Sequence, residues 1–171
     1  MTLEERALIF ATKAHKGQVR KYTGEPYVNH PIAVANLIRG RAGVSEYMIA
    51  AALLHDTVED TDTTIEDIKR EFGDIVAIFV DGLTDLSKPE DGNRATRKEI
   101  DRQHLAKGLP PVHTIKLADL IDNSKSIEEF DKDFAKVYMA EKKKLLEVLN
   151  CGDKDLCMQA KCIVDSYYSV S

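Results

Sequence analysis

The 171 residues of the chain suffice for one domain with a real hydrophobic core, and a content of 43% hydrophobic and 31% charged residues excludes intrinsic disorder. A formal net charge of −5 disfavours nucleic acid as a partner, because broad nucleic-acid binding needs a strongly basic face. The longest apolar runs, residues 48–54 and 75–80, are too short to span a membrane, and the charged N-terminus does not resemble a secretion signal, so we expect a cytoplasmic protein with no membrane partner.

The first helix is expected over residues 3–15. Thr2 and Glu5 have the spacing of a capping box, in which two side chains satisfy the free amide groups of a helix start. A loop follows, and it places two adjacent cations, Arg20 and Lys21, in an acidic protein. These cations either meet a negatively charged ligand or belong to a solvated loop tip.

The second helix is expected to begin at His30 and Pro31, since proline suits the first helical position, where no amide hydrogen is needed. His30 would then be held rigidly at a helix start. A lone histidine there is more often a cap or core residue than a metal ligand. A third helix, capped by Ser45, carries apolar side chains as far as Leu54.

Four ionisable side chains follow this apolar helix within residues 55–60. At helical spacing His55 lies four residues before Glu59, and Asp56 lies four before Asp60, so all four can project into one cleft. Burying them without a partner is costly, and a divalent cation is the natural partner. The His-Asp pair would bind the cation and leave Glu59 and Asp60 as acid or base. The alternative is a solvated acidic helix end.

The rest of the chain predicts helices only. They are expected over residues 64–72, 75–83, 94–108, 112–127, 134–150 and 154–168. The apolar run at residues 75–80 has the composition of a strand as well, but no second strand candidate exists to pair with it. We therefore predict an all-α fold, a single compact bundle of about eight helices that forms one domain over residues 1–171.

Asp119 is flanked on both sides by apolar residues within the helix expected at residues 112–127. Asn123 and Ser126 follow it at helical spacing on the same face. Asp119 is either a functional carboxylate or an acid on the exposed rim of an amphipathic helix.

Two imidazoles and two carboxylates, drawn from three helices, form the candidate ligand set. They are His30, His55, Asp56 and Asp119. Such a set suits manganese, iron or zinc and leaves positions open for water and substrate, as in catalytic sites. Because a bound cation lowers the pKa of water and polarises a phosphoryl oxygen, phosphoryl hydrolysis is the reaction class that suits these groups best.

Four motifs occur in order between residues 7 and 127. They are AHKGQVRK at 14–21, GEPYVNHP at 24–31, LLHDTVEDT at 53–61 and IKLAD at 115–119, the last followed by Asn123. In this order they resemble the HD-domain metal-dependent phosphohydrolases. More narrowly, the chain resembles the hydrolase domain of the RelA/SpoT-type alarmone enzymes, and most closely the stand-alone small alarmone hydrolases. The helices expected in residues 131–168 would follow this motif core.

The resemblance implies hydrolysis of the 3′-pyrophosphate of ppGpp or pppGpp, giving GDP or GTP and pyrophosphate, with Mn²⁺ as the usual ion. It implies that the metal ligands are His30, His55, Asp56 and Asp119. Glu59 and Asp60 would activate water, while Arg20 would stack on the purine and Lys21 would meet phosphate, roles that suit a planar guanidinium and an ammonium. The groups expected at the sugar-phosphate portion of the nucleotide are Asn123 and Ser126.

Residues 120–122, Leu-Ile-Asp, depart from the more basic or aromatic residues that the family often has there, and they add an acid near the nucleotide. The substrate therefore stays open to another nucleotide such as (p)ppApp or NADPH. Two rival hypotheses are a non-catalytic nucleotide sensor and a helical scaffold with an incidental polar cluster. Too few residues follow Ile127 for a synthetase domain, so we expect degradation of alarmones only. The oligomeric state stays open.

Overall fold

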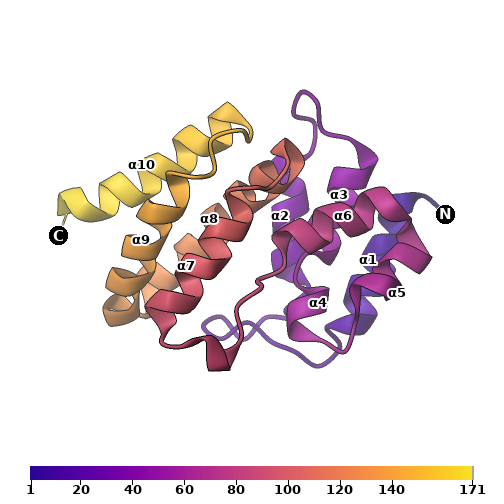
Figure 1. Ribbon diagram of the computed structural model, residues 1–171, viewed down its shortest axis with the longest axis horizontal. Helices are drawn as coiled ribbons and strands as arrows, with labels where there is room; N and C mark the ends of the chain where they lie inside the picture. Colours follow the sequence, from indigo (N-terminus) through magenta and orange to yellow (C-terminus); the bar gives the residue numbers. More distant parts are fainter. Residues whose placement is uncertain (171) are drawn as a thin grey trace. The chain divides into compact units, whose positions relative to one another are not determined.

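The computed structural model describes residues 1–170, except for the side chains of residues 128 and 170. Over these residues the chain is all-helical (Figure 1), which confirms the predicted fold class. The helices are α1 (Leu3–Ala14), α2 (Asn29–Ile38), α3 (Glu46–Leu54), α4 (Thr57–Asp60), α5 (Ile65–Phe72), α6 (Asp74–Leu83), the 3-10 turn η1 (Pro89–Asp91), α7 (Arg94–Leu105), α8 (Pro110–Phe130), α9 (Lys132–Leu146) and α10 (Lys154–Val170). Residues 1–84 form one compact unit and the described residues from 85 onward form a second. That the chain is a single domain stays a prediction.

Capping boxes start two helices of the first unit, as the sequence predicts. The backbone amide of Glu5 donates to the Thr2 hydroxyl at 3.1 Å, and the Thr2 amide donates to the Glu5 carboxylate at 2.8 Å. Thr64 and Asp67 repeat this arrangement at α5. Each box satisfies amide groups that the first helical turn leaves without a carbonyl partner.

Helix α3 is the centre of the first unit. All seven residues of Met48–Leu54 are buried, because α3 packs against α1, α2 and α6. A helix that is apolar on every side is stable only when other elements surround it. The last turn of α3 is therefore rigid, and it holds the residues that follow it in a fixed position.

A short break separates α3 from α4. His55 and Asp56 keep right-handed helical backbone angles, but they join the two helices without belonging to either. The Thr57 hydroxyl donates to the carbonyl of Leu54 at 2.7 Å, which satisfies an acceptor at the helix end. Continuous helical spacing through residues 55–60 was expected. The break is one reason why the described residues contain more helices than the predicted eight or so.

The apolar run at residues 75–80 is helical, as expected, and forms part of α6. Val76 and Val80 are fully buried, whereas Ile75 and Ile78 remain 46% and 54% exposed. Gly73, with a φ of 86°, turns the chain between α5 and α6. Glycine adopts this left-handed conformation without the steric penalty that a Cβ atom would bring.

Helix α8 is the longest of the second unit, and both α9 and α10 pack against it. It begins at Pro110, two residues before the expected start, because the first helical positions need no amide hydrogen and accept two prolines. Gly152 packs closely on α8: a Cβ atom there would lie 2.8 Å from a Leu117 methyl carbon and 3.0 Å from the backbone of His113. Among the described residues, no helix has both the length and the apolar character needed to cross a membrane.

Candidate metal centre

Three predicted ligands of the first unit converge. Nitrogen and oxygen donors of His30, His55 and Asp56 all lie within 4.8 Å of one another. Nε2 of His55 is 3.1 Å from one Asp56 carboxylate oxygen, and Nε2 of His30 is 3.6 Å from the other. Both histidines are only 2% exposed, and the Asp56 side chain is 15% exposed. Two imidazoles and a carboxylate at this separation fit a divalent cation.

The imidazole of His55 has a defined tautomer. Its Nδ1 lies 2.8 Å from the carbonyl oxygen of Ala52. A carbonyl only accepts a hydrogen bond, so Nδ1 carries the proton and Nε2 keeps the lone pair that a metal needs. The last turn of α3 supplies this acceptor, because its carbonyl groups lack amide partners further along the helix. The backbone thereby orients the ring as a ligand.

Asp56 is held by a second side chain, the phenol of Tyr27. The Tyr27 hydroxyl donates to the Asp56 carboxylate at 2.7 Å. Burial and the negative charge of Asp56 raise the pKa of Tyr27 strongly, so this hydroxyl stays protonated and remains a donor. The Tyr27 ring also lies against the rings of His15 and His30. Tyr27 was not predicted as a site residue, although it lies in the motif that carries His30.

A hydrogen-bond relay joins the end of α1 to Asp60. Nδ1 of His15 lies 2.8 Å from the side-chain oxygen of Gln18, whose amide donates to the backbone carbonyl of Asp60 at 2.7 Å. Partial desolvation and the neighbouring charge of Asp56 raise the pKa of the Asp60 carboxyl. Asp60 consequently holds a proton more readily than an ordinary aspartate. His15 and Gln18 were also missed, and their place in the first motif is the only signal that sequence offered.

The other predicted residues of the first unit lie on exposed or partly exposed segments. Glu59 is exposed on α4. Arg20 opens a tight turn, in which its amide donates to the carbonyl of Glu25 at 2.8 Å. Lys21 is exposed and its ammonium lies over the ring of Tyr22. The turn is therefore ordered, and the roles of these three side chains stay predictions.

Asp119 of the second unit is 6% exposed on α8, which is inconsistent with an acid on an exposed rim. One of its carboxylate oxygens lies 2.9 Å from the ammonium of Lys116, and the other accepts a hydrogen bond from Asn123 at 2.6 Å. The Ser126 hydroxyl donates to the carbonyl of Asn123 at 3.3 Å. Asp119 is thus held at both oxygens. That it completes the ligand set with the first unit stays a prediction.

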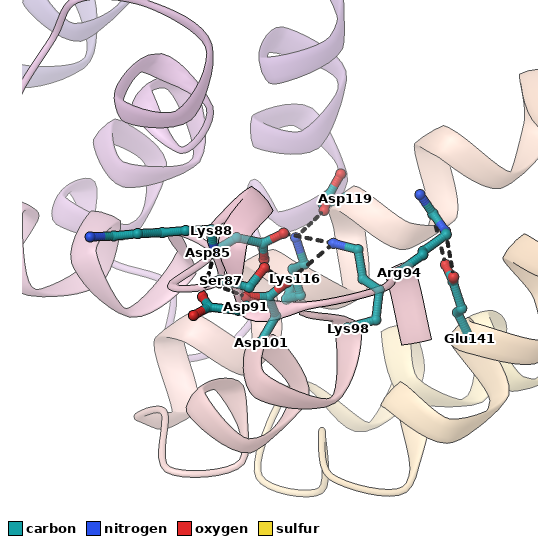
Figure 2. Close-up of polar contacts among 10 residues, drawn as sticks. All are labelled: Asp85, Ser87, Lys88, Asp91, Arg94, Lys98, Asp101, Lys116, Asp119 and Glu141. Atoms are coloured by element: carbon teal, nitrogen blue, oxygen red, sulfur yellow. Dashed lines mark hydrogen bonds and ion pairs between the residues drawn. The ribbon is translucent and has the colours of Figure 1, made fainter. Parts of the chain in front are cut away.

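Lys116 and Asp119 belong to a wider, partly buried network (Figure 2). The ammonium of Lys98 lies 2.7 Å from Asp85 and 3.4 Å from Asp101, and Asp101 accepts two hydrogen bonds from Ser87. Burial of Asp85 is outweighed by the positive charges of Lys116 and Lys98, which together lower its pKa. Asp85 and Asp101 were not predicted from sequence, because Asp85 meets Lys98 of α7 and Lys116 of α8 only in the folded chain.

Known proteins resemble this chain over most of its length. The sequence profile of the HD domain matches residues 7–145. A guanosine-3′,5′-bis(diphosphate) 3′-pyrophosphohydrolase of Aquifex aeolicus is 43% identical over 141 residues, which are 79% of this chain and 20% of that protein. The human enzyme of the same name, MESH1, is 39% identical over 123 residues, covering 69% of this chain and 65% of its own length. The chain spans only 15% of a Streptomyces coelicolor GTP pyrophosphokinase, at 39% identity.

A solved structure has the same fold. It is that of a metazoan orthologue of SpoT, described as hydrolysing ppGpp and acting in starvation responses. The TM-score is 0.87 at 29% sequence identity, and the match covers 98% of this chain and 96% of the other.

Proposed function

The chain belongs to the HD-domain family, and from this premise we propose that it hydrolyses the 3′-pyrophosphate of ppGpp and pppGpp, releasing pyrophosphate and leaving GDP or GTP. The observation that carries the proposal is the convergence of His30, His55 and Asp56, with Nε2 of His55 3.1 Å from an Asp56 carboxylate oxygen. The likeness to alarmone hydrolases of known activity supports the choice of substrate.

His30, His55 and Asp56 would hold a divalent cation, and we propose Asp119 as the fourth ligand. Mn²⁺ is the proposed ion, because two nitrogen and two carboxylate donors suit a cation of intermediate hardness. When bound, the cation would polarise a phosphoryl oxygen and make water more acidic. Asn123 and Lys116 restrain the Asp119 carboxylate, which supports a ligand role since metal-binding carboxylates are normally held by hydrogen bonds.

Glu59 and Asp60 are the proposed pair that orients water and moves its proton. The raised pKa of Asp60 supports this role, because an acid whose pKa is closer to neutral exchanges a proton more effectively. Tyr27 positions Asp56 by donating a hydrogen bond, and its hydroxyl keeps its proton because its pKa is strongly raised.

Arg20, Lys21, Asn123 and Ser126 are the proposed contacts to the nucleotide. Arg20 offers a planar guanidinium for stacking, and the exposed Lys21 offers a point charge for phosphate. The negative net charge of the chain supports a small nucleotide as partner in place of nucleic acid. A cytoplasmic location is part of the same proposal.

A substrate panel tests the proposal. Purified protein with Mn²⁺ is incubated with ppGpp, pppApp or NADPH, and the products are separated by anion-exchange chromatography. We expect GDP and pyrophosphate from ppGpp. The His55→Ala variant should be inactive, whereas His104→Ala, which removes a histidine outside the ligand set, should retain activity.

The panel also separates the rival hypotheses. Turnover of pppApp or NADPH but not ppGpp would identify another nucleotide as the substrate. The departure from the family pattern at Asp122 is compatible with such a substrate. Tight binding of ppGpp with no turnover of any compound would indicate a sensor. Failure to bind Mn²⁺ at all would favour a helical scaffold.

A further inference from the structure

A cysteine and a histidine meet in the second unit, and neither belongs to the predicted ligands or nucleotide contacts. Cys151 lies in the segment that joins α9 to α10, and His113 lies in the first turn of α8. Sγ of Cys151 is 3.0 Å from Nδ1 of His113. Cys151 is exposed to solvent, whereas His113 is only 1% exposed. An accessible nucleophile is thus in contact with a covered base.

The backbone fixes the tautomer of His113. Its Nε2 lies 2.7 Å from the carbonyl oxygen of Leu105. A carbonyl only accepts a hydrogen bond, so Nε2 carries the proton and Nδ1 keeps its lone pair. The Cys151 thiol therefore donates to Nδ1. A nucleophile, a base and a group that orients the base are arranged in this way wherever a side chain is activated for attack.

The segment that carries Cys151 is held against α8. The backbone amide of Cys151 donates to Nδ1 of His113 at 3.4 Å, and the amide of Asp153 donates to the Thr114 hydroxyl at 3.0 Å. Between them, Gly152 approaches α8 so closely that a Cβ atom would lie 3.0 Å from the backbone of His113. The main chain thereby keeps the thiol within reach of the imidazole.

The contact contributes more to reactivity than to stability. A thiol is a weak hydrogen-bond donor, so it gains little as the partner of a buried nitrogen. A base beside a thiol, in contrast, removes the proton that prevents the sulfur from attacking. The other two cysteines of the chain, Cys157 and Cys162, lie on α10, and within the described residues no hydrogen bond joins either thiol to a histidine.

We propose that Cys151 is a site of thiol–disulfide exchange with small disulfides and that His113 is its base. Nδ1 of His113 takes the thiol proton, and Sγ of Cys151 attacks one sulfur of the disulfide. A new S–S bond forms to Cys151 while the original S–S bond breaks. The electron pair of the broken bond leaves on the second sulfur, which takes the proton from His113. Cys151 is oxidised to a mixed disulfide, and the departing half is reduced to a thiol.

The rate of reaction with DTNB, an aromatic disulfide that releases a coloured thiolate, tests the site in the full-length chain. In the Cys157→Ser/Cys162→Ser protein, Cys151 is the sole thiol. We expect it to react at least about tenfold faster in the folded protein than in urea, with each rate divided by that of N-acetylcysteine in the same solvent. Unfolding normally exposes thiols and speeds their reaction, so the opposite order identifies the folded Cys-His pair.

The Cys151→Ser/Cys157→Ser protein is the matched control, because it keeps Cys162, which is also exposed. Its thiol should react no faster in the folded protein than in urea. His113→Gln in the protein with Cys151 as sole thiol should slow the folded rate to that of the control. Incubation of the unmodified protein with oxidised glutathione, followed by mass spectrometry, should show the adduct at Cys151.

Three results would overturn the proposal. They are a Cys151 rate in the folded protein no higher than in urea, an unchanged rate in folded His113→Gln, and equal modification of Cys151 and Cys162 by oxidised glutathione. The comparison with urea needs no change at the buried His113, so it is decisive even where that variant does not fold. None of these measurements uses a metal or a nucleotide, so they are independent of the proposed hydrolysis.

Discussion

Replacing Tyr27 with phenylalanine removes one hydroxyl and leaves the aromatic ring in place. That hydroxyl donates to Asp56 at 2.7 Å in a largely covered site. A hydrogen bond to a charged acceptor contributes about 1.5–3 kcal/mol, and partners that orient a metal ligand typically change metal affinity by about 10–100-fold. We therefore expect Tyr27→Phe to bind Mn²⁺ about 10–100-fold more weakly, because the Asp56 carboxylate loses its orientation.

Isothermal titration of metal-free protein with MnCl₂ measures this change. Tyr47→Phe is the matched control, since Tyr47 is 37% exposed at the start of α3, at the opposite end of that helix from His55. Circular dichroism before each titration verifies that the variants are folded. Equal Mn²⁺ affinity in Tyr27→Phe and the unmodified protein would refute the idea that the tyrosine positions Asp56.

Three further changes test other parts of the account. Asp60→Asn should raise the melting temperature of the metal-free protein at pH 7, because the raised pKa of Asp60 means that its ionised carboxylate destabilises the fold. The gain should vanish as the pH falls below the pKa of an ordinary aspartate. A lower melting temperature of the variant at pH 7 would contradict the reasoning. Lys116→Met should lower the free energy of unfolding in urea by about 3 kcal/mol, because it leaves Asp119 buried without its cation. Lys116→Arg should lower the free energy of unfolding by less. Equal losses in the two variants would count against the ion pair. Gly152→Ala should cost about 1–3 kcal/mol in the same assay through its contact with Leu117, and an unchanged unfolding midpoint would contradict the close packing.

Features set by neighbouring residues were predictable from sequence. The capping boxes at Thr2 and Thr64 depend on side chains three residues apart, so their pattern is visible in any single sequence. The apolar run before His55 likewise identified the central helix, because burial on every side requires apolar residues at every position. His55 and Asp56 come directly after this helix in sequence, so they were predictable as site residues at its end.

Contacts between distant segments were not predictable in this way. Tyr27 and Asp56 are 29 residues apart, and nothing local in either segment indicates that they meet. Lys98 and Asp85 are 13 residues apart and likewise meet only through the packing of the folded chain. The prediction of continuous helical spacing also failed at the α3–α4 break, where the Thr57 hydroxyl donates to a carbonyl at the end of α3.

Phosphorus NMR of ppGpp incubated with the Mn²⁺-loaded protein tests the central claim most directly, because it reports which phosphates leave the nucleotide. We predict that the 3′-diphosphate signals disappear, that free pyrophosphate appears and that the 5′-diphosphate signals persist, with no change in the presence of His55→Ala protein. Loss of the 5′-diphosphate, or an unaltered spectrum with metal-loaded protein, would contradict the proposed activity.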